Sequence, residues 1–587
     1  MPEEPSQGDA IRAFFDALTR QEKWFAGRIA EDPIGLILRT AINELDWFSY
    51  NLARESEPSF DQQEQFYLLR IGVTRLIKLA LESRPSFDVP TIMLRRNRDV
   101  TVPVLEIAAG LGMIEHGRRV AQTAMGGLGR VEQVAAGEFV INLPPALPDE
   151  EFYERSVAEH FDAAARDQLG KLLHSAEGRE TTRQIDELLT ELAYPFMEHF
   201  IGYDSDPALD TYFFGLATHV LRMKKGYDSF NPAARFGGVS FLKYILGLTF
   251  LVSLAIRHER SAEALVVKVP SIRLENVLTV SAEIAPFLDD MLAAINFFGE
   301  LLEGFEQVTP DEVWTIFRVL STGRDNAEIL DRPGSPLPLL IRTSDNDCIR
   351  CQAAVLANPM QYLLDSLRFH FPREYDENQR GREGPMQLAI RRVLNDIFDG
   401  LLYRDNVRLR LDGRTLTDID VVVLEPATSI VLLVQLKHQD IYGMDIHSRH
   451  SRGRRLQQQA ERWLSAVEEW IVRSSDEDIR SALRLPSEFG RPRMYRVIVA
   501  RHFGYPIVSL SEADDNAVAN WDQFYNATLL VKQQRRPWSL ADLVSALRAS
   551  VRPGGPQHHQ AEPRSEWIIN DLKFRTVQVQ EAAEGAD

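Results

Sequence analysis

Apolar residues recur at helical spacing through most of the first 330 positions. Leu38, Ile42 and Leu45 mark one such helix. Apolar side chains three and four positions apart share one face of a helix, so this pattern predicts helices packed on a core. We expect residues 1–145 to form a helical domain and residues 149–345 to form a second, α-helical domain, with a proline-rich string between them.

A different pattern interrupts the first of these domains. Residues 131–143 alternate in the manner of two short strands around the turn sequence Ala136–Gly137. Helices followed by such a hairpin are typical of a winged-helix element that binds DNA. A small packing domain is the alternative, because only Arg118, Arg119 and Arg130 supply positive charge nearby.

Beyond residue 336, β-branched runs alternate with helical patterns, as in an α/β domain. Two strands flank the turn Asp412–Gly413, a strong hairpin signal. The sequence predicts four strands in all, at Val407–Leu411, Leu416–Leu424, Ile430–Lys437 and Arg496–Ala500. The long apolar runs in the second and third predict central strands of a mixed sheet, covered on both faces.

We assign residues 360–550 to this α/β domain. The last segment, residues 551–587, is polar and rich in Gly, Pro and His, so we expect it to be largely mobile. Trp567–Ile569 is the one apolar group that would tether part of it.

A helix precedes the first strand of the α/β domain. Pro385 suits the first turn of a helix, and Leu388, Val393 and Leu394 with Ile397 are expected to form its apolar stripe. Glu383 then lies at the entrance of the helix rather than on its buried side.

Two of the predicted strands carry polar pairs at one end. Asp418 and Asp420 share a strand face by alternation, and so do Gln435 and Lys437. Burying an aspartate and a lysine against a sheet costs several kcal/mol unless they pair with each other or with a metal. Buried charged residues at the ends of two adjacent strands therefore indicate a functional site.

Phosphodiester hydrolysis would explain these residue types. Mg²⁺ or Mn²⁺ prefers oxygen ligands. We expect Asp420 to be the central ligand, with Glu383, the amide oxygen of Gln435 and the main-chain carbonyl of Leu436 as further ligands. Lys437 would orient the attacking water and offset charge that develops on the phosphate.

The order Glu383, then Asp420 within Thr-Asp-Ile-Asp-Val-Val-Val, then Gln435-Leu436-Lys437 resembles the PD-(D/E)XK pattern of restriction-endonuclease-like nucleases. Glutamine at the third position is similar to the QxK version in Mrr-type restriction endonucleases. The resemblance covers roughly residues 373–531. It implies a metal-dependent endonuclease acting on DNA, in an arrangement like that of bacterial restriction and anti-phage effectors.

Several alternatives remain open from the sequence. Glu374 or Asp396 is an alternative source of the helix carboxylate. Asp420 and Lys437 could form an ion pair without catalysis, either in an inactive nuclease-like module that binds other proteins or in an unrelated α/β fold. An RNA-cleaving nuclease would use the same residues.

A basic segment follows the third strand. Arg449, Arg452 and Arg454 are expected in a loop that contacts phosphates. The next helix buries Leu456, Ala460, Trp463 and Val467 at helical spacing. Arg455, Gln459 and Arg462 lie on a neighbouring side of that helix, which the resemblance places beside the active site. The alternative is a solvated basic loop before an amphipathic helix.

The charge of the chain limits where nucleic acid can bind. The net charge is −19, which argues against a general nucleic-acid coat protein. Residues 373–473, however, hold 16 Arg and Lys and 16 Asp and Glu, so the excess acid lies elsewhere. A neutral module on an acidic body is compatible with a local phosphate-binding groove.

Two cysteines, Cys348 and Cys351, exclude a disulfide framework and provide only half of a structural zinc site. We expect two buried thiols. The first residues lack a secretory signal, and the longest apolar stretch, Tyr244–Ile256, is shorter than the roughly 18 residues that span a bilayer. We expect a cytoplasmic protein with no membrane-embedded part, whose helical region binds a protein partner or a second copy, or gates the nuclease.

Overall fold

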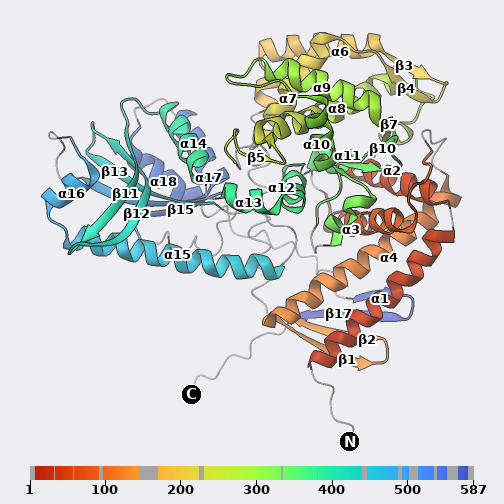
Figure 1. The fold of residues 1–587 in the computed structure, drawn as a ribbon, viewed down its shortest axis with the longest axis horizontal. Coiled ribbons are helices and arrows are strands. Elements are labelled where there is room, and N and C mark those ends of the chain that lie inside the picture. Colours follow the sequence, from red (N-terminus) through yellow and green to blue (C-terminus); the bar gives the residue numbers. More distant parts are fainter. Residues whose placement is uncertain are drawn as a thin grey trace, which may run out of the picture.

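The computed structural model shows a helical body and a smaller α/β lobe (Figure 1). It describes residues 7–578 except 32, 57, 91–96, 144–168, 224–229, 332–334, 358, 380, 439–445, 487–488, 490–491, 502–509, 511–512, 534–537 and 551–565. Helices dominate the N-terminal part and a mixed sheet follows later in the chain, as the sequence predicts at this level.

Four long helices open the helical body: α1 (Gln7–Glu31), α2 (Ile34–Leu52), α3 (Phe60–Ser83) and α4 (Arg98–Thr123). Helix α3 begins with a capping box, in which Ser59 and Gln62 satisfy each other's backbone N–H groups. Helices α3 and α4 cross closely at Gly72, where a Cβ atom would lie 1.9 Å from the carbonyl oxygen of Ala108. Glycine is required there because the backbone of α4 fills the space.

After the π-helical turn η1 (Ala124–Leu128), the predicted hairpin is present as β1 (Arg130–Ala135) and β2 (Glu138–Leu143), with Gly137 at φ +77°. It is not a free wing. Strand β17 (Leu572–Gln578) pairs in parallel with β2, and β16 (Glu566–Ile569) completes a four-stranded sheet in the order β1-β2-β17-β16. The winged-helix interpretation therefore does not describe this element.

The C-terminal strands are anchored in the core of the helical body. Trp567 and Phe574 are buried, and the Phe574 ring lies 5.3 Å from that of Phe14 in α1. The expectation of a largely mobile tail is therefore wrong for residues 566–578. Short strands after a Gly- and Pro-rich segment carry no signal of a parallel partner more than 400 positions earlier in the chain.

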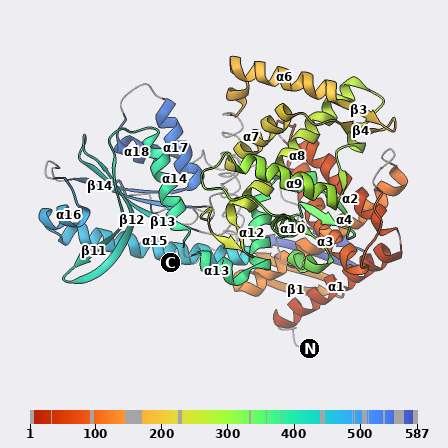
Figure 2. The same ribbon diagram turned by 45° about the horizontal axis from the view of Figure 1, so that its top comes forward.

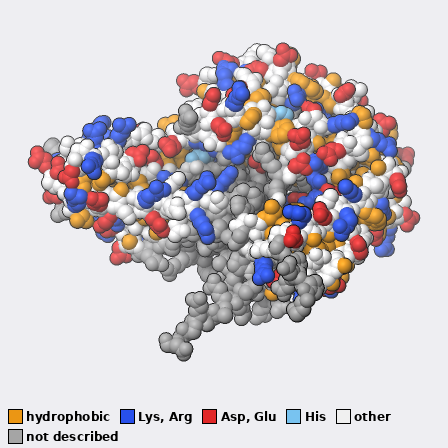
Figure 3. Space-filling view, turned by 60° about the horizontal axis from the view of Figure 1, so that its bottom comes forward, with side chains coloured by type: hydrophobic (Ala, Val, Ile, Leu, Met, Phe, Trp, Pro, Cys, Tyr) orange, Lys and Arg blue, Asp and Glu red, His pale blue; other side chains and the backbone are white. Residues whose placement is uncertain are grey.

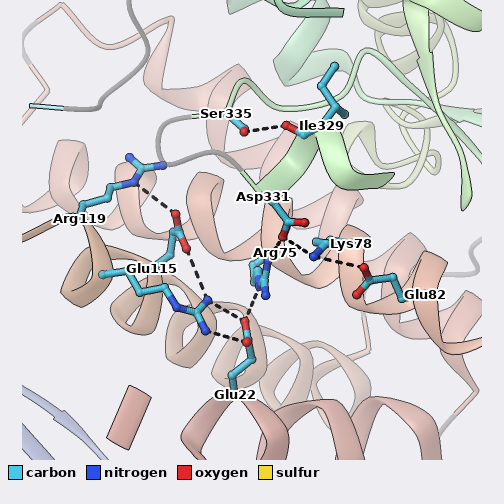
Figure 4. A network of polar contacts seen from close by, with 10 residues as sticks. Glu22, Arg75, Lys78, Glu82, Glu115, Arg119, Ile329, Asp331 and Ser335 are labelled. Atoms are coloured by element: carbon cyan, nitrogen blue, oxygen red, sulfur yellow. Dashed lines mark hydrogen bonds and ion pairs between the residues drawn. The ribbon is translucent and has the colours of Figure 1, made fainter. Parts of the chain in front are cut away.

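The arginines near the hairpin are engaged inside the body (Figure 4). Arg118 binds both carboxylate oxygens of Glu22 at 2.8 and 2.7 Å, and the buried Arg119 lies 3.6 Å from Glu115. Figure 4 also shows Asp331, from the second half of the body, against Arg75 of α3. Of the three arginines named for DNA contact, only Arg130 is exposed.

The rest of the body contains further helices and small sheets. Its helices are α6 (Ala176–Leu192), α7 (Pro207–Met223), α8 (Phe241–Lys268), α9 (Ile284–Gly299), α10 (Pro310–Leu320), α11 (Gln352–Ala357), α12 (Pro359–His370) and α13 (Pro372–Gln379), with 3₁₀ turns η2 (Leu274–Asn276) and η3 (Arg324–Asp331).

Two of its sheets are hairpins, β3 (Ala193–Phe196) with β4 (Phe200–Tyr203) and β5 (Arg235–Phe236) with β6 (Val239–Ser240). The third sheet has the order β7-β10-β9-β8 and consists of β7 (Val280–Glu283), β8 (Ser321–Thr322), β9 (Leu340–Arg342) and β10 (Asp347–Arg350). The prediction of an α-helical domain over residues 149–345 missed these strands, which have two to four residues each and are too short for a period-two pattern.

One hydrophobic core joins the first and second halves of the helical body, and two smaller clusters lie beside it around α6, β3 and the second half of α8. It includes Phe14 of α1, Leu248 of α8, Leu363 of α12 and Phe574 of β17. The two predicted helical domains therefore share a core, and the proline-rich string between them lies outside the described residues. Helices α11–α13 pack into the same core, so the α/β lobe begins near Arg382 rather than at residue 360.

Two further sequence expectations concern this core. Helix α8 is long and apolar enough to cross a membrane, but 83% of its most apolar window is buried inside the body. Cys348 and Cys351 are free, buried thiols, as expected, and burial raises the pKa of Cys348 to about 12. No group of three His, Cys, Asp or Glu side chains that could hold a metal occurs among the described residues.

The α/β lobe is built on a five-stranded mixed sheet, in the order β11-β12-β13-β14-β15. Strands β11 to β13 are antiparallel neighbours, and β13, β14 and β15 are parallel. The four predicted strands are confirmed within this sheet. Its elements are α14 (Glu383–Asn395), β11 (Leu402–Leu411), β12 (Arg414–Glu425), β13 (Ile430–Lys437), α15 (Ile446–Arg473), α16 (Asp476–Leu483), β14 (Arg493–Ala500), β15 (Asn516–Asn520), α17 (Trp521–Gln533) and α18 (Leu540–Ser550).

Helices cover both faces of this sheet (Figures 1 and 2). Helices α14, α17 and α18 pack on one face, and α15 and α16 pack on the other. The buried stripe of α14 consists of Met386, Ile390 and Leu394, whereas Leu388 is 55% exposed. Of the predicted stripe, Leu394 is buried and Val393 and Ile397 are partly buried against the same core, so the prediction is wrong for Leu388.

The carboxyl ends of β13 and β14 point toward the helical body. Helix α15 starts on that side and contacts α4, while its far end is tied to the β11–β12 turn through Arg473 and Asp412. The sequence-predicted site residues at the end of β13 thus lie on the side of the sheet next to the body.

Candidate active site

The candidate site forms where β12 and β13 separate. Their ladder stops at the pair Val421 and Val434, one residue before Asp420 and Gln435. Beyond that point the Asp420 carboxylate takes the place of a backbone partner, because its Oδ2 accepts the N–H of Leu436 at 2.5 Å. This hydrogen bond joins the two strand ends that the sequence marked.

The alternation of β12 is interrupted at Asp420. Ile419 packs in the core on the α15 side of the sheet, whereas Val421 packs in the core on the α14 side. Residues two apart in a regular strand would share a face. The two aspartates of this strand also differ in environment, because Asp418 is exposed and Asp420 is buried, although the charge of Asp418 acts on Asp420.

Two residues that the sequence reasoning missed hold this irregularity. Asn406 of β11, opposite the break, has a positive φ of +51°. Gln387 of α14 donates from its Nε2 to the Asn406 side-chain oxygen at 3.2 Å and to the Asp420 carbonyl oxygen at 3.0 Å. One amide thus clamps the helix to both strands at the point where Asp420 departs from the ladder.

Gln387 also explains how Glu383 reaches the site. Glu383 and Gln387 are one helical turn apart and lie on the same side of α14. Since Gln387 binds the backbone of Asp420, Glu383 is directed to the same strand end. The negative charge of Glu383 contributes to the raised pKa of Asp420 and opposes the lowering of the pKa of Lys437.

Asp420 has an unusual electrostatic environment for an aspartate. Its pKa is raised to about 7, chiefly by burial and also by the neighbouring carboxylates of Glu383 and Asp418, while the Leu436 N–H and Lys437 oppose the shift. A carboxylate that is this difficult to ionise is stabilised by any cation that binds beside it.

Lys437 lies in the same electrostatic group. Burial lowers the pKa of its ammonium, and the charges of Asp420, Glu383 and Asp418 act in the opposite direction. Arg462 of α15 lowers it as well, so a second cation lies close to the amine. By alternation from Val431 and Leu433, Lys437 projects to the α15 side of the sheet.

Gln435 offers an oxygen for a metal ion. Its side chain is only 6% exposed, and its Oε1 has no hydrogen-bond partner among the described residues. A buried acceptor without a partner is costly, so such an atom is typically used by a ligand, ion or water. The oxygens of Gln435, Asp420 and Glu383 form a hard donor set that suits Mg²⁺ or Mn²⁺.

The Leu436 carbonyl is consistent with the fourth predicted ligand. The N–H of Leu436 points to β12, since it donates to Asp420. The carbonyl oxygen of the next residue, Lys437, points to β14 and accepts the N–H of Arg501. The N–H and C=O of one strand residue point to the same side. The Leu436 carbonyl therefore also faces the end of β12.

The two alternative carboxylates do not lie at the site. Glu374 of α13 accepts the backbone N–H of Gly237 at 2.9 Å and ties α13 to the β5–β6 hairpin. Asp396 is exposed just past the other end of the 13-residue α14, about 20 Å along the helix from Glu383. Glu383 is the carboxylate of this helix that reaches Asp420.

The basic segment is helical rather than a loop. Helix α15 begins at Ile446, so Arg449, Arg452 and Arg454 lie within its first turns, and the side chain of Arg449 is outside the described residues. The prediction of a loop was therefore wrong for these residues. Leu456, Ala460, Trp463 and Val467 are buried, as predicted.

Four of the predicted phosphate-binding residues form one row on α15, which we call the α15 row: Arg452, Arg455, Gln459 and Arg462. They recur at three- and four-residue spacing beside the buried stripe, whereas Arg454 lies on the opposite side of the helix. Trp463 fixes the end of the row, because its Nε1 donates to the Asp418 carbonyl oxygen at 2.9 Å. In Figure 3 both signs of charge are mixed over the α/β lobe, so the row is a local feature.

Comparisons of the chain with protein-family models, with curated proteins and with solved structures give no significant match.

Proposed function

We propose that the α/β lobe is a restriction-endonuclease-like domain that hydrolyses phosphodiester bonds of DNA with a divalent cation. One observation supports the proposal: where β12 and β13 separate, the Asp420 carboxylate accepts the N–H of Leu436, which lies between Gln435 and Lys437, and Gln387 ties α14, which begins at Glu383, to the same strand end. Two carboxylates, a buried amide oxygen and an amine are the groups that such hydrolysis needs.

The cation would be Mg²⁺ or Mn²⁺, held by Glu383, Asp420, Gln435 and the Leu436 carbonyl, and it would supply positive charge to the phosphate oxygens. Hydrolysis forms a bond from a water oxygen to phosphorus and breaks the bond to the leaving sugar oxygen, which takes up a proton. Lys437 orients the water and offsets negative charge on the phosphate. Because burial lowers its pKa, its amine exchanges a proton more readily than an exposed lysine does.

The α15 row would carry the nucleic acid across the site. Arg455 and Arg462 are exposed and lie seven residues apart, about 10 Å along the helix. Guanidinium groups at this spacing can contact two separate backbone phosphates. In this proposal the helical body, on the side of the strand ends, senses a trigger or a partner, as in bacterial restriction and anti-phage proteins.

A second candidate function is a nuclease-like module without catalysis. The observation that favours it is the glutamine at position 435, where the PD-(D/E)XK pattern usually has an acid. Apart from the exposed Asp418, only the carboxylates of Asp420 and Glu383 then act on Lys437. An RNA-cleaving nuclease is the other candidate and uses the same residues.

The test is cleavage of plasmid, linear DNA and RNA by the purified full chain with Mg²⁺, Mn²⁺ or EDTA. We expect metal-dependent DNA cleavage, and a loss of about 100-fold or more in Lys437→Ala. Lys532→Ala, which removes an exposed lysine of α17, is the matched control. Cleavage of RNA alone would assign the RNA-cleaving activity, and equal activity of wild type and Lys437→Ala would remove the assigned site. No cleavage at all would favour the non-catalytic module.

A further inference from the structure

Arg382 connects the candidate site to the helical body. It is the residue immediately before Glu383, yet it is only 4% exposed and its guanidinium lies in the body rather than in the α/β lobe. The guanidinium carbon is 3.9 Å from the ring centre of Phe230 and 5.0 Å from that of Tyr375. Buried cation–π contacts of this kind are strong and directional.

The two rings are rigidly held. Phe230 and Tyr375 pack edge to face at 5.1 Å, and both belong to the core of the helical body. Helix α13, which carries Tyr375, is tied to the β5–β6 hairpin by two hydrogen bonds. Gly237 donates its N–H to Glu374, and Asn378 donates its Nδ2 to the Arg235 carbonyl oxygen at 2.9 Å. Arg382 is thus held by a well-packed part of the body.

No flexible break separates Arg382 from the site. Its backbone is already helical, with φ −71° and ψ −23°, and α14 continues directly from it. Glu383 is exposed, and among the described residues no ion pair ties it to the α/β lobe. The position of Glu383 therefore follows that of Arg382, with Gln387 as the next anchor of the helix on the sheet.

We propose that Arg382, held between Phe230 and Tyr375, is a positioning residue through which the helical body sets Glu383 at the metal site. A partner or trigger that rearranges the rings of the body would then withdraw or restore one metal ligand, and the body would regulate the nuclease through its metal affinity. This inference rests on the proposed function, because it assigns Glu383 to the metal.

The experiment measures Mn²⁺ binding to the full chain by calorimetry, together with the Mg²⁺ concentration for half-maximal cleavage. Phe230→Leu and Arg382→Lys are expected to weaken Mn²⁺ binding about 10-fold and to raise the Mg²⁺ midpoint by a similar factor. Phe236→Leu is the matched control, since Phe236 is a buried ring of the same cluster but is not one of the two rings beneath Arg382. Thermal unfolding confirms that each variant is folded.

Glu383→Gln distinguishes positioning from a general structural effect. In that background Phe230→Leu and Arg382→Lys are expected to cause no further loss of Mn²⁺ affinity. Equal Mn²⁺ affinity of Phe230→Leu and Phe236→Leu, or a loss that persists without Glu383, would overturn the inference while leaving the nuclease intact. If Mn²⁺ affinity depends on Arg382 and Phe230 in this way but no substrate is cleaved, the proposed function is rejected and the role of Arg382 is retained. A wild-type chain that binds no Mn²⁺ would reject both.

Discussion

Asp420 is the residue at which stability and the proposed chemistry conflict. A buried carboxylate whose pKa is raised to about 7 opposes folding when it is charged. Its ordinary pKa is 3.8, so the difference of about three units corresponds to as much as about 4 kcal/mol above pH 7. A protein retains such a group where it is needed for binding.

Asp420→Asn is therefore expected to lose cleavage activity and to gain stability. The wild-type chain binds more protons at this position when folded, so its contribution is most favourable below about pH 4 and is lost as the pH rises to about 7. The free energy of unfolding of Asp420→Asn should therefore exceed that of the wild type most above pH 7 in EDTA, and this difference should shrink as the pH falls. Urea unfolding at several pH values measures it, and a destabilised Asn variant at pH 8 would contradict the argument.

Gln435 decides the charge of the site. Gln435→Glu adds a third carboxylate beside Asp420 and Glu383, and the side chain is buried. We expect the variant to need about 10-fold less Mg²⁺ for half-maximal cleavage, because the site becomes more negative. Without metal it should melt at a lower temperature than wild type, since like charges are then buried together.

Gln435→Met, which offers no amide oxygen, should show weaker metal binding.

At the scale of elements, α14 and α15 bring the helix-borne groups to the strand ends. Gln387 fixes α14 on the backbone of Asp420, and Trp463 fixes α15 on the backbone of Asp418. Because both anchors are side chain to backbone, the two helices are tied to the irregular strand itself. Glu383 and Arg462 then approach Lys437 from different helices.

The α15 row predicts a difference between two sides of one helix. Arg455→Ala with Arg462→Ala should lower DNA affinity and reduce the slope of log affinity against log salt by about 1.8, if each arginine neutralises one phosphate. Arg454→Ala is the control from the opposite side and should leave the slope unchanged. Titrations of a catalytically inactive chain with duplex DNA at several salt concentrations test this. Equal slopes for both changes would show that the row does not contact the backbone.

At the scale of the whole molecule, the α/β lobe is inserted into the helical body. The body surrounds it in the sequence, with Arg382 at its start and β16 and β17 after its end. The lobe is therefore connected at both ends to one packed unit, and its candidate site lies on the side next to that unit.

Removal of the C-terminal strands should destabilise the body rather than the lobe. A chain that ends at residue 565 loses four buried side chains, Trp567, Ile569, Leu572 and Phe574. The loss in unfolding free energy should be on the order of 5 kcal/mol, and the truncated chain should bind a hydrophobic dye. A chain that ends at residue 578 keeps both strands and should unfold like the full protein. Unchanged melting of the shorter chain would refute this role.

Local patterns were sufficient to predict much of the fold. The alternation of β12 and β13, the Asp412–Gly413 turn and the buried stripe of α15 follow from periods of two and 3.6 residues, which need no distant partner. For the same reason the strand-end pairs containing Asp420 and Lys437 could be recognised, because a charged side chain in an apolar strand is anomalous by itself.

Only the tertiary structure decided the features that depend on distant contacts. The break at Asp420, the clamp by Gln387, the parallel pairing of β17 with β2 and the burial of Arg382 between two rings have no local periodicity. Their stability comes from groups that meet after folding, so the chain alone specifies the residues but not which of them become neighbours.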